Sequence, residues 1–66
     1  MQVDKVKLSR AIAGKGMLIS EVQRAAGLNV GTMYRLVKHG GPARLSTIGK
    51  VAKVLGVDIM EIVVEG

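Results

Sequence analysis

The sequence predicts a single all-α domain of five short helices, spanning residues 1–66. Glycines interrupt the chain at short intervals, and each group follows a segment whose apolar residues recur with helical spacing. No segment shows the strict apolar–polar alternation of a half-buried strand. The expected helices cover residues 4–13, 18–25, 29–38, 45–55 and 58–64, and the glycines that end them are Gly14 with Gly16, Gly27, Gly40 with Gly41, and Gly56.

Each expected helix has an apolar face. The fourth is the clearest, because Lys50 and Lys53 lie opposite its apolar stripe. The faces, in chain order, consist of Leu8, Ala11 and Ile12; Ile19, Val22 and Ala26; Met33, Leu36 and Val37; Leu45, Ile48, Val51, Ala52 and Leu55; and Ile59, Ile62 and Val63. A short edge strand is the alternative for residues 61–65.

Charge is unevenly distributed along the chain. Ten Lys and Arg residues against five Asp and Glu give a formal net charge of +5. No acid stands between Val22 and Val57, whereas Asp58, Glu61 and Glu65 follow this stretch. The acid-free stretch holds Arg24, Arg35, Lys38, Arg44, Lys50 and Lys53. Such a one-sided field attracts polyanions; the alternative is a solvated basic helix surface without a partner.

The composition argues against several classes of protein. Without cysteine and with one histidine, His39, the chain offers no disulfide, metal cluster or nucleophile–base pair, so we expect neither an enzyme nor a cofactor, metal or small-molecule ligand. The Gly14-Lys15-Gly16 run lacks the spacing of a phosphate-binding loop and is expected to end a helix. No apolar run approaches the roughly 18 residues of a membrane span, and no secretory signal is visible, so we expect a cytoplasmic domain.

The third segment carries the functional signal. Asn29 is a good N-cap, and Met33, Leu36 and Val37 form a core-facing side. The opposite face carries Gly31, Tyr34, Arg35 and Lys38, with Val30 at its edge. Such a face suits the DNA major groove, where arginine bonds guanine and glycine permits close approach. The alternative is an ordinary solvated face with a partly buried Tyr34.

The residues before this segment form a tight turn between two helices. Ala25 and Ala26 are small enough for the helices to cross closely, and Gly27 can adopt a positive φ. Together with the basic face that follows, this pattern predicts a helix-turn-helix unit.

The chain from Gly16 to Val63 resembles the Cro/C1-type (XRE-type, phage repressor-like) helix-turn-helix family, in its small-regulator branch. The matching residues are Gly16, Met17, Ile19, Glu21 and Val22 at the second helix; Ala25, Gly27, Leu28, Asn29 and residues 32–36 in the turn and third helix; and residues 45–62 in the last two helices. The resemblance implies a five-helix, lambda-repressor-like fold. It also implies a repressor-like regulator of transcription, from a bacterium, phage or mobile element, that binds double-stranded DNA as a homodimer on a palindromic operator.

The resemblance also implies which residues touch DNA. Base-edge contacts fall at Val30, Gly31, Tyr34 and Arg35, and phosphate contacts at Ile19, Asn29, Thr32, Lys38, His39 and Arg44. Many relatives carry a polar or cationic residue in place of Val30 or Gly31, so Tyr34 and Arg35 must carry most of the direct readout. DNA shape is expected to supply the rest.

The C-terminal segment is the expected dimer surface, through Ile59, Ile62, Val63 and Val64, because its apolar residues exceed what one face can bury in so small a core. A rival function is a protein-interaction module of the antitoxin or adaptor kind that keeps this fold. A further alternative is the N-terminal domain of a longer repressor.

Overall fold

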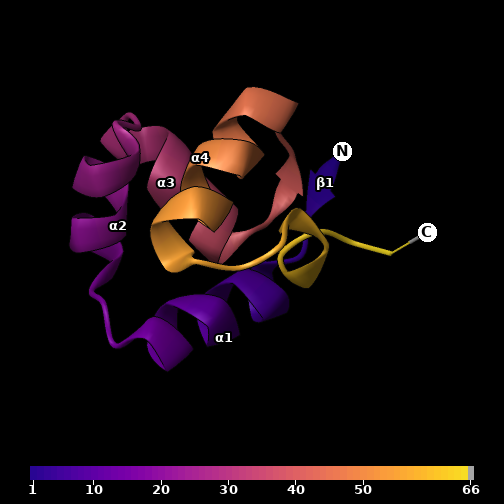
Figure 1. The fold of residues 1–66 in the computed structure, drawn as a ribbon. Coiled ribbons are helices and arrows are strands. Elements are labelled where there is room, and N and C mark those ends of the chain that lie inside the picture. The colour runs from indigo at the N-terminus through magenta and orange to yellow at the C-terminus, as the bar shows by residue number, and fades with distance from the viewer. Residues whose placement is uncertain (66) are drawn as a thin grey trace.

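The computed structural model describes residues 1–65 and has four α-helices around an aliphatic core (Figure 1). Gly66, the last residue of the predicted domain, lies outside the described residues. The elements are β1 (Gln2–Val3), α1 (Lys5–Lys15), α2 (Ile19–Ala26), α3 (Val30–Lys38), β2 (Gly41–Pro42), α4 (Leu45–Leu55) and the 3-10 turn η1 (Ile59–Glu61). The prediction of a mostly helical domain with a helix-turn-helix is therefore confirmed.

The helices end where the glycines predict. Gly16, Gly27 and Gly56 take left-handed φ values of 73°, 67° and 67° and donate their N–H groups to the last carbonyls of α1, α2 and α4. Gly14 lies inside α1, which continues to Lys15, so the expected end at residue 13 is wrong by two residues. Gly16 alone supplies the left-handed residue that this end requires.

The helix starts rely on different caps. The Asp4 carboxylate accepts hydrogen bonds from the N–H groups of Val6 and Lys7 at 2.9 and 3.1 Å. At α2 the N-cap Leu18 has no acceptor, and the Glu21 carboxylate instead accepts from the Leu18 N–H at 2.7 Å. The second helix therefore begins at Ile19 despite its weak cap.

The predicted fifth helix is corrected by the structure. Asp58 caps a single 3-10 turn, after which the chain becomes extended. Val63 forms an antiparallel bridge with Val3, and the Val64 N–H donates to the Gln2 carbonyl at 2.8 Å. The β-branched residues 62–64 favour this extended conformation. The alternative of a short edge strand at residues 61–65 describes this segment better.

The same pairing changes the expected dimer surface. Ile62 and Val63 are 1% and 2% exposed and belong to the core, so they cannot face a second copy. Ile59 is half-buried against that core, and Val64 is exposed. Of the predicted dimer residues Ile59, Ile62, Val63 and Val64, the two buried ones, Ile62 and Val63, are therefore wrong, because the core of so short a chain needs these side chains itself.

Strand β1 also pairs with β2 in antiparallel register, Gln2 with Pro42 and Val3 with Gly41. Strand β1 thus lies between the connection of α3 to α4 on one side and residues 62–64 on the other (Figure 1). The core that these elements enclose consists of Val3, Leu8, Ile12, Val22, Ala26, Met33, Leu36, Ile48, Val51, Ala52, Leu55, Ile62 and Val63. No part of the sheet appears in the sequence as an alternating pattern, because its strands are too short.

Among the glycines of residues 1–65, Gly40 is the one least able to accept a side chain. It has a φ of 68°, and a Cβ there would lie 2.5 Å from the Val3 carbonyl oxygen. We expect Gly40→Ala to lower the free energy of unfolding by about 3 kcal/mol or more, since positive φ and a backbone clash act together. Chemical denaturation followed by circular dichroism measures this. Gly16→Ala is the matched control, because it has a similar φ and open space, and should cost about 1 kcal/mol. Equal costs would show that Gly40 does not limit the approach of β1.

Candidate nucleic-acid interface

The turn between α2 and α3 is held by local hydrogen bonds. The Gln23 side chain donates to the Leu28 carbonyl at 2.5 Å, and the Leu28 N–H donates to the Gln23 carbonyl at 3.0 Å. The Asn29 side chain then accepts from the Gly31 N–H at 2.8 Å and starts α3. Val22 and Ala26 are buried beneath the turn. These contacts set α3 at a defined angle to α2 and to the core.

Helix α3 is divided between core and solvent. Met33 and Leu36 are fully buried, which leaves the opposite side of the helix free. Val30 and Tyr34 are 58% and 47% exposed, and Gly31 lies on the same exposed side. The alternative of an ordinary solvated face with a partly buried Tyr34 fits these exposed fractions equally well. Helix α3 therefore offers a surface of small and aromatic groups that no other element covers.

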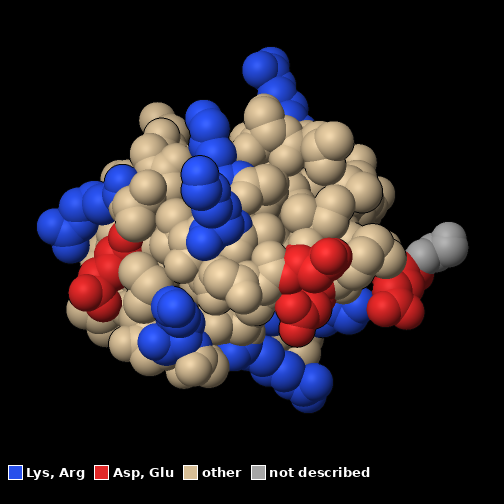
Figure 2. All heavy atoms as spheres, in the orientation of Figure 1, with Lys and Arg blue, Asp and Glu red and all other residues tan. Residues whose placement is uncertain are grey.

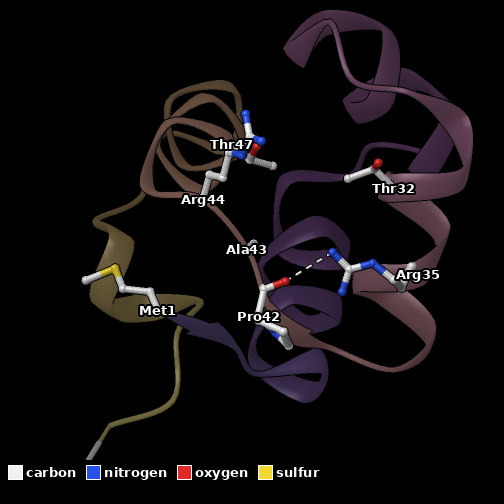
Figure 3. A pocket seen from close by; sticks show the side chains of 7 residues that line it. All are labelled: Met1, Thr32, Arg35, Pro42, Ala43, Arg44 and Thr47. Atoms are coloured by element: carbon white, nitrogen blue, oxygen red, sulfur yellow. Dashed lines mark hydrogen bonds between the residues drawn. The ribbon is translucent and has the colours of Figure 1, made fainter.

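Arg35 lies on α3 but bonds elsewhere. Its guanidinium donates to the Pro42 carbonyl at 3.1 Å (Figure 3). It also donates, more weakly, to the Gly40 carbonyl at 3.5 Å. The side chain thus extends from the helix toward β2. Its contact with a base stays a prediction, and that contact would have to compete with these hydrogen bonds.

An open hollow of about 540 Å³ lies between α3 and the start of α4 (Figure 3). Thr32 and Arg35 line it from α3, and Arg44 and Thr47 line it from the start of α4. Met1, Pro42 and Ala43 complete the lining. Arg44 is the N-cap of α4 and supplies no side-chain acceptor, so the first N–H groups of this helix lack a side-chain cap. Two guanidiniums and two hydroxyls beside a helix start form a surface suited to phosphate oxygens.

The hollow gathers only part of the predicted phosphate set. It brings Thr32 and Arg44 together and adds Thr47, a residue that the sequence interpretation missed. The signal for Thr47 was its place in the first turn of a helix that follows an arginine. Four predicted residues lie outside the lining: Ile19, half-buried at the start of α2; Asn29, which caps α3; and Lys38 and His39, exposed at the end of α3. Only backbone N–H groups near Ile19 are suited to a phosphate, because its side chain packs against the core.

Among the described residues, no ion pair involves a cation of the central stretch. Within residues 1–65 the ion pair found is Lys7 with Glu65, at 3.5 Å on the surface. Figure 2 shows the face that α2 and α4 share, where Lys and Arg side chains project from a mostly uncharged surface. Carboxylates gather mainly toward the C-terminal segment, with one further acidic group beside α2. The positive field of the central stretch is therefore not neutralised by pairing.

These features together define a helix-turn-helix DNA-binding domain. A comparison with protein families matches residues 7–64 to the Cro/C1-type HTH DNA-binding domain, and the chain belongs to this family. The family resemblance read from the sequence is thus confirmed. The match supports a DNA-binding regulator in general. Searches of curated protein sequences and of solved structures gave no match.

Two further features concern residues 1–65 alone. None of their helices is long and apolar enough to cross a membrane. In the same range, no group of three or more His, Cys, Asp or Glu side chains comes together in a way that could hold a metal ion.

Tyr34 and Met33 are neighbours in sequence with opposite environments. We expect Tyr34→Ala to change the free energy of unfolding by less than about 0.5 kcal/mol, because its side chain leaves no cavity. The affinity of the Tyr34→Ala variant for DNA should fall about tenfold. Met33→Ala should instead cost about 2–5 kcal/mol of stability. Chemical denaturation and fluorescence anisotropy with a labelled duplex measure both quantities. A Tyr34→Ala variant that binds DNA like the unaltered protein would place the interface elsewhere.

Proposed function

We propose that the chain is a sequence-specific regulator of transcription that binds double-stranded DNA by laying α3 in the major groove. The observation that carries the proposal is the exposed side of α3, which lies directly beside a hollow lined by two arginines. A major groove about 12 Å wide admits one α-helix, and the hollow then faces the adjoining sugar-phosphate backbone. One surface can thus contact both bases and phosphates.

Three residues of α3 are suited to base edges. Val30 offers methyl groups that can contact a thymine methyl, and Tyr34 offers a ring with a hydroxyl. Gly31 has no side chain, which permits close approach of the helix backbone to the bases. A Cβ there would also crowd the N-cap, because it would lie 3.1 Å from the Asn29 side-chain oxygen. Because these groups carry few base-specific donors, DNA shape contributes a large share of the specificity.

The phosphate contacts lie on both sides of α3. Thr32, Arg44 and Thr47 face one stretch of backbone from the hollow, with the uncapped start of α4 beside them. The remaining contacts are backbone N–H groups near Ile19, the Asn29 amide, and Lys38 and His39 at the end of α3. This arrangement fixes the register of α3 on the duplex without itself reading sequence.

We further propose that two copies bind one palindromic operator and act as a repressor. One recognition helix reads only about four or five base pairs, so useful specificity requires two helices about one turn of DNA apart. Met60 and Val64, 49% and 51% exposed, are the apolar side chains that the C-terminal segment leaves for a second copy. The neighbouring acids Asp58, Glu61 and Glu65 keep this end away from phosphate. Occupancy of an operator that overlaps a promoter is sufficient for repression.

Binding measured against salt tests the function directly. Two copies that each place two or three cations on phosphates would give a log–log slope of binding against salt of about −4 to −5. Sedimentation of the complexes with a full and a half operator, chosen by selection from random DNA, should find two chains and one chain respectively.

Three outcomes would contradict this account. A slope shallower than about −2 would remove the central cations from the interface. No binding to random duplex at low salt would favour the protein-interaction module. A single chain that binds the full site with undiminished specificity would exclude the dimer.

A further inference from the structure

The short sheet has two outer edges, and each is covered by a cationic side chain. Strand β1 is its middle strand, since β2 pairs on one side and residues 62–64 on the other. At the outer edge of the C-terminal segment, the Lys7 ammonium donates to the Val63 carbonyl at 3.1 Å. At the outer edge of β2, the Arg35 guanidinium performs the equivalent function.

The carbonyls that Arg35 contacts face away from β1. Because Gly41 pairs with Val3 and the Ala43 N–H donates to the Met1 carbonyl at 3.1 Å, residues 41 and 43 direct their backbone groups toward β1. The carbonyls of Gly40 and Pro42 alternate with them and point outward. Pro42 has no N–H, so this edge presents acceptors where a guanidinium supplies only donors. One planar group therefore contacts both carbonyls, two residues apart.

This contact joins the middle of α3 to the segment that leads into α4. Arg44, the N-cap of α4, stands two residues after Pro42. Arg35 and Arg44 line the same hollow. Carbonyl dipoles hold the Arg35 charge on the β2 side, which leaves the side of Arg44 and Thr47 open. Loss of the Arg35 hydrogen bonds would free the β2 edge and, with it, the position of Arg44 relative to α3.

We propose that Arg35 is a positioning residue, which caps the outer edge of β2 and thereby sets Arg44 for contact with a DNA phosphate, and that it does not read a base. This proposal rests on the DNA-binding function proposed above. It replaces the base contact that the family resemblance implies for Arg35, and it leaves the base-facing side of α3 to Val30, Gly31 and Tyr34.

Hydrogen exchange in the free protein tests the edge contact without DNA. In Arg35→Met, the amides of Gly41 and Ala43 should exchange about tenfold faster or more, since the strand that they belong to loses its outer hydrogen bonds. Arg35→Lys, which keeps the charge and can still bond one carbonyl, should restore part of the protection. Lys38→Met is the matched control: it removes a cation from the same helix and should leave these two amides unchanged.

A double-mutant cycle with Arg44→Ala then tests positioning. In the unaltered protein Arg44→Ala should lower DNA affinity about tenfold. In the Arg35→Met background the same change should cost less than about threefold, because Arg44 is already displaced. When Lys38→Met replaces Arg35→Met in the cycle, the losses of affinity caused by Lys38→Met and Arg44→Ala should multiply in the double variant. The order of preference among duplexes with single base changes should stay the same in Arg35→Met.

The outcomes separate this inference from the proposed function. Altered base preference in Arg35→Met with unchanged exchange at Gly41 and Ala43 would make Arg35 a base contact and overturn the proposal. Independent losses for Arg35→Met and Arg44→Ala would also overturn it, while the DNA-binding function would stand. If the unaltered protein bound no duplex, the proposed function itself would fail, whatever the exchange rates showed.

Discussion

Backbone hydrogen bonds on both sides of β1 hold together three segments that are far apart in sequence. Val3 is buried and pairs with Gly41 on one side and Val63 on the other. The pairing brings the α3–α4 connection and the C-terminal segment to the same place, and Gly40 permits the close approach. Without β1, neither the burial of Ile62 and Val63 nor the hollow between α3 and α4 would be defined. A strand of two residues thus positions both Ile62 and Val63 of the core and the segment that leads to the proposed phosphate contacts.

The proposed DNA surface follows from the way in which apolar side chains are divided between the core and the exposed side of α3. The core uses most of the large aliphatic groups of α1, α3 and α4, and only Val6, Val30 and Leu45 of these helices are largely exposed. The exposed side of α3 is thus left to Val30 and to small, aromatic and cationic residues. The cations of the central stretch keep a common field, because the acids lie toward the C-terminal segment and at α2. Packing therefore selects the face of α3 that points outward, and charge distribution favours a polyanion as its partner.

The sequence was sufficient for the features that depend on local patterns. Residues 45–55 were expected as a helix and form α4, and Gly27 and Asn29 correctly indicated the turn before α3. The sequence was insufficient to predict the contacts between residues that are distant along the chain. The bridge between Val3 and Val63 turns the expected fifth helix into an extended segment, and the contact of Arg35 with Pro42 crosses from a helix to a strand. Two-residue strands show no alternation, so local periodicity carries no signal for either contact.

The central claim is that the exposed side of α3 lies in the major groove, and intermolecular nuclear Overhauser effects test it most directly. Thymine methyl groups and cytosine H5 protons lie in the major groove, whereas adenine H2 protons lie in the minor groove. In a complex with a selected operator, the account predicts contacts from the Val30 methyls and the Tyr34 ring to thymine methyls or cytosine H5. Contacts from these two side chains to adenine H2 protons, or none to DNA while other residues show them, would contradict it.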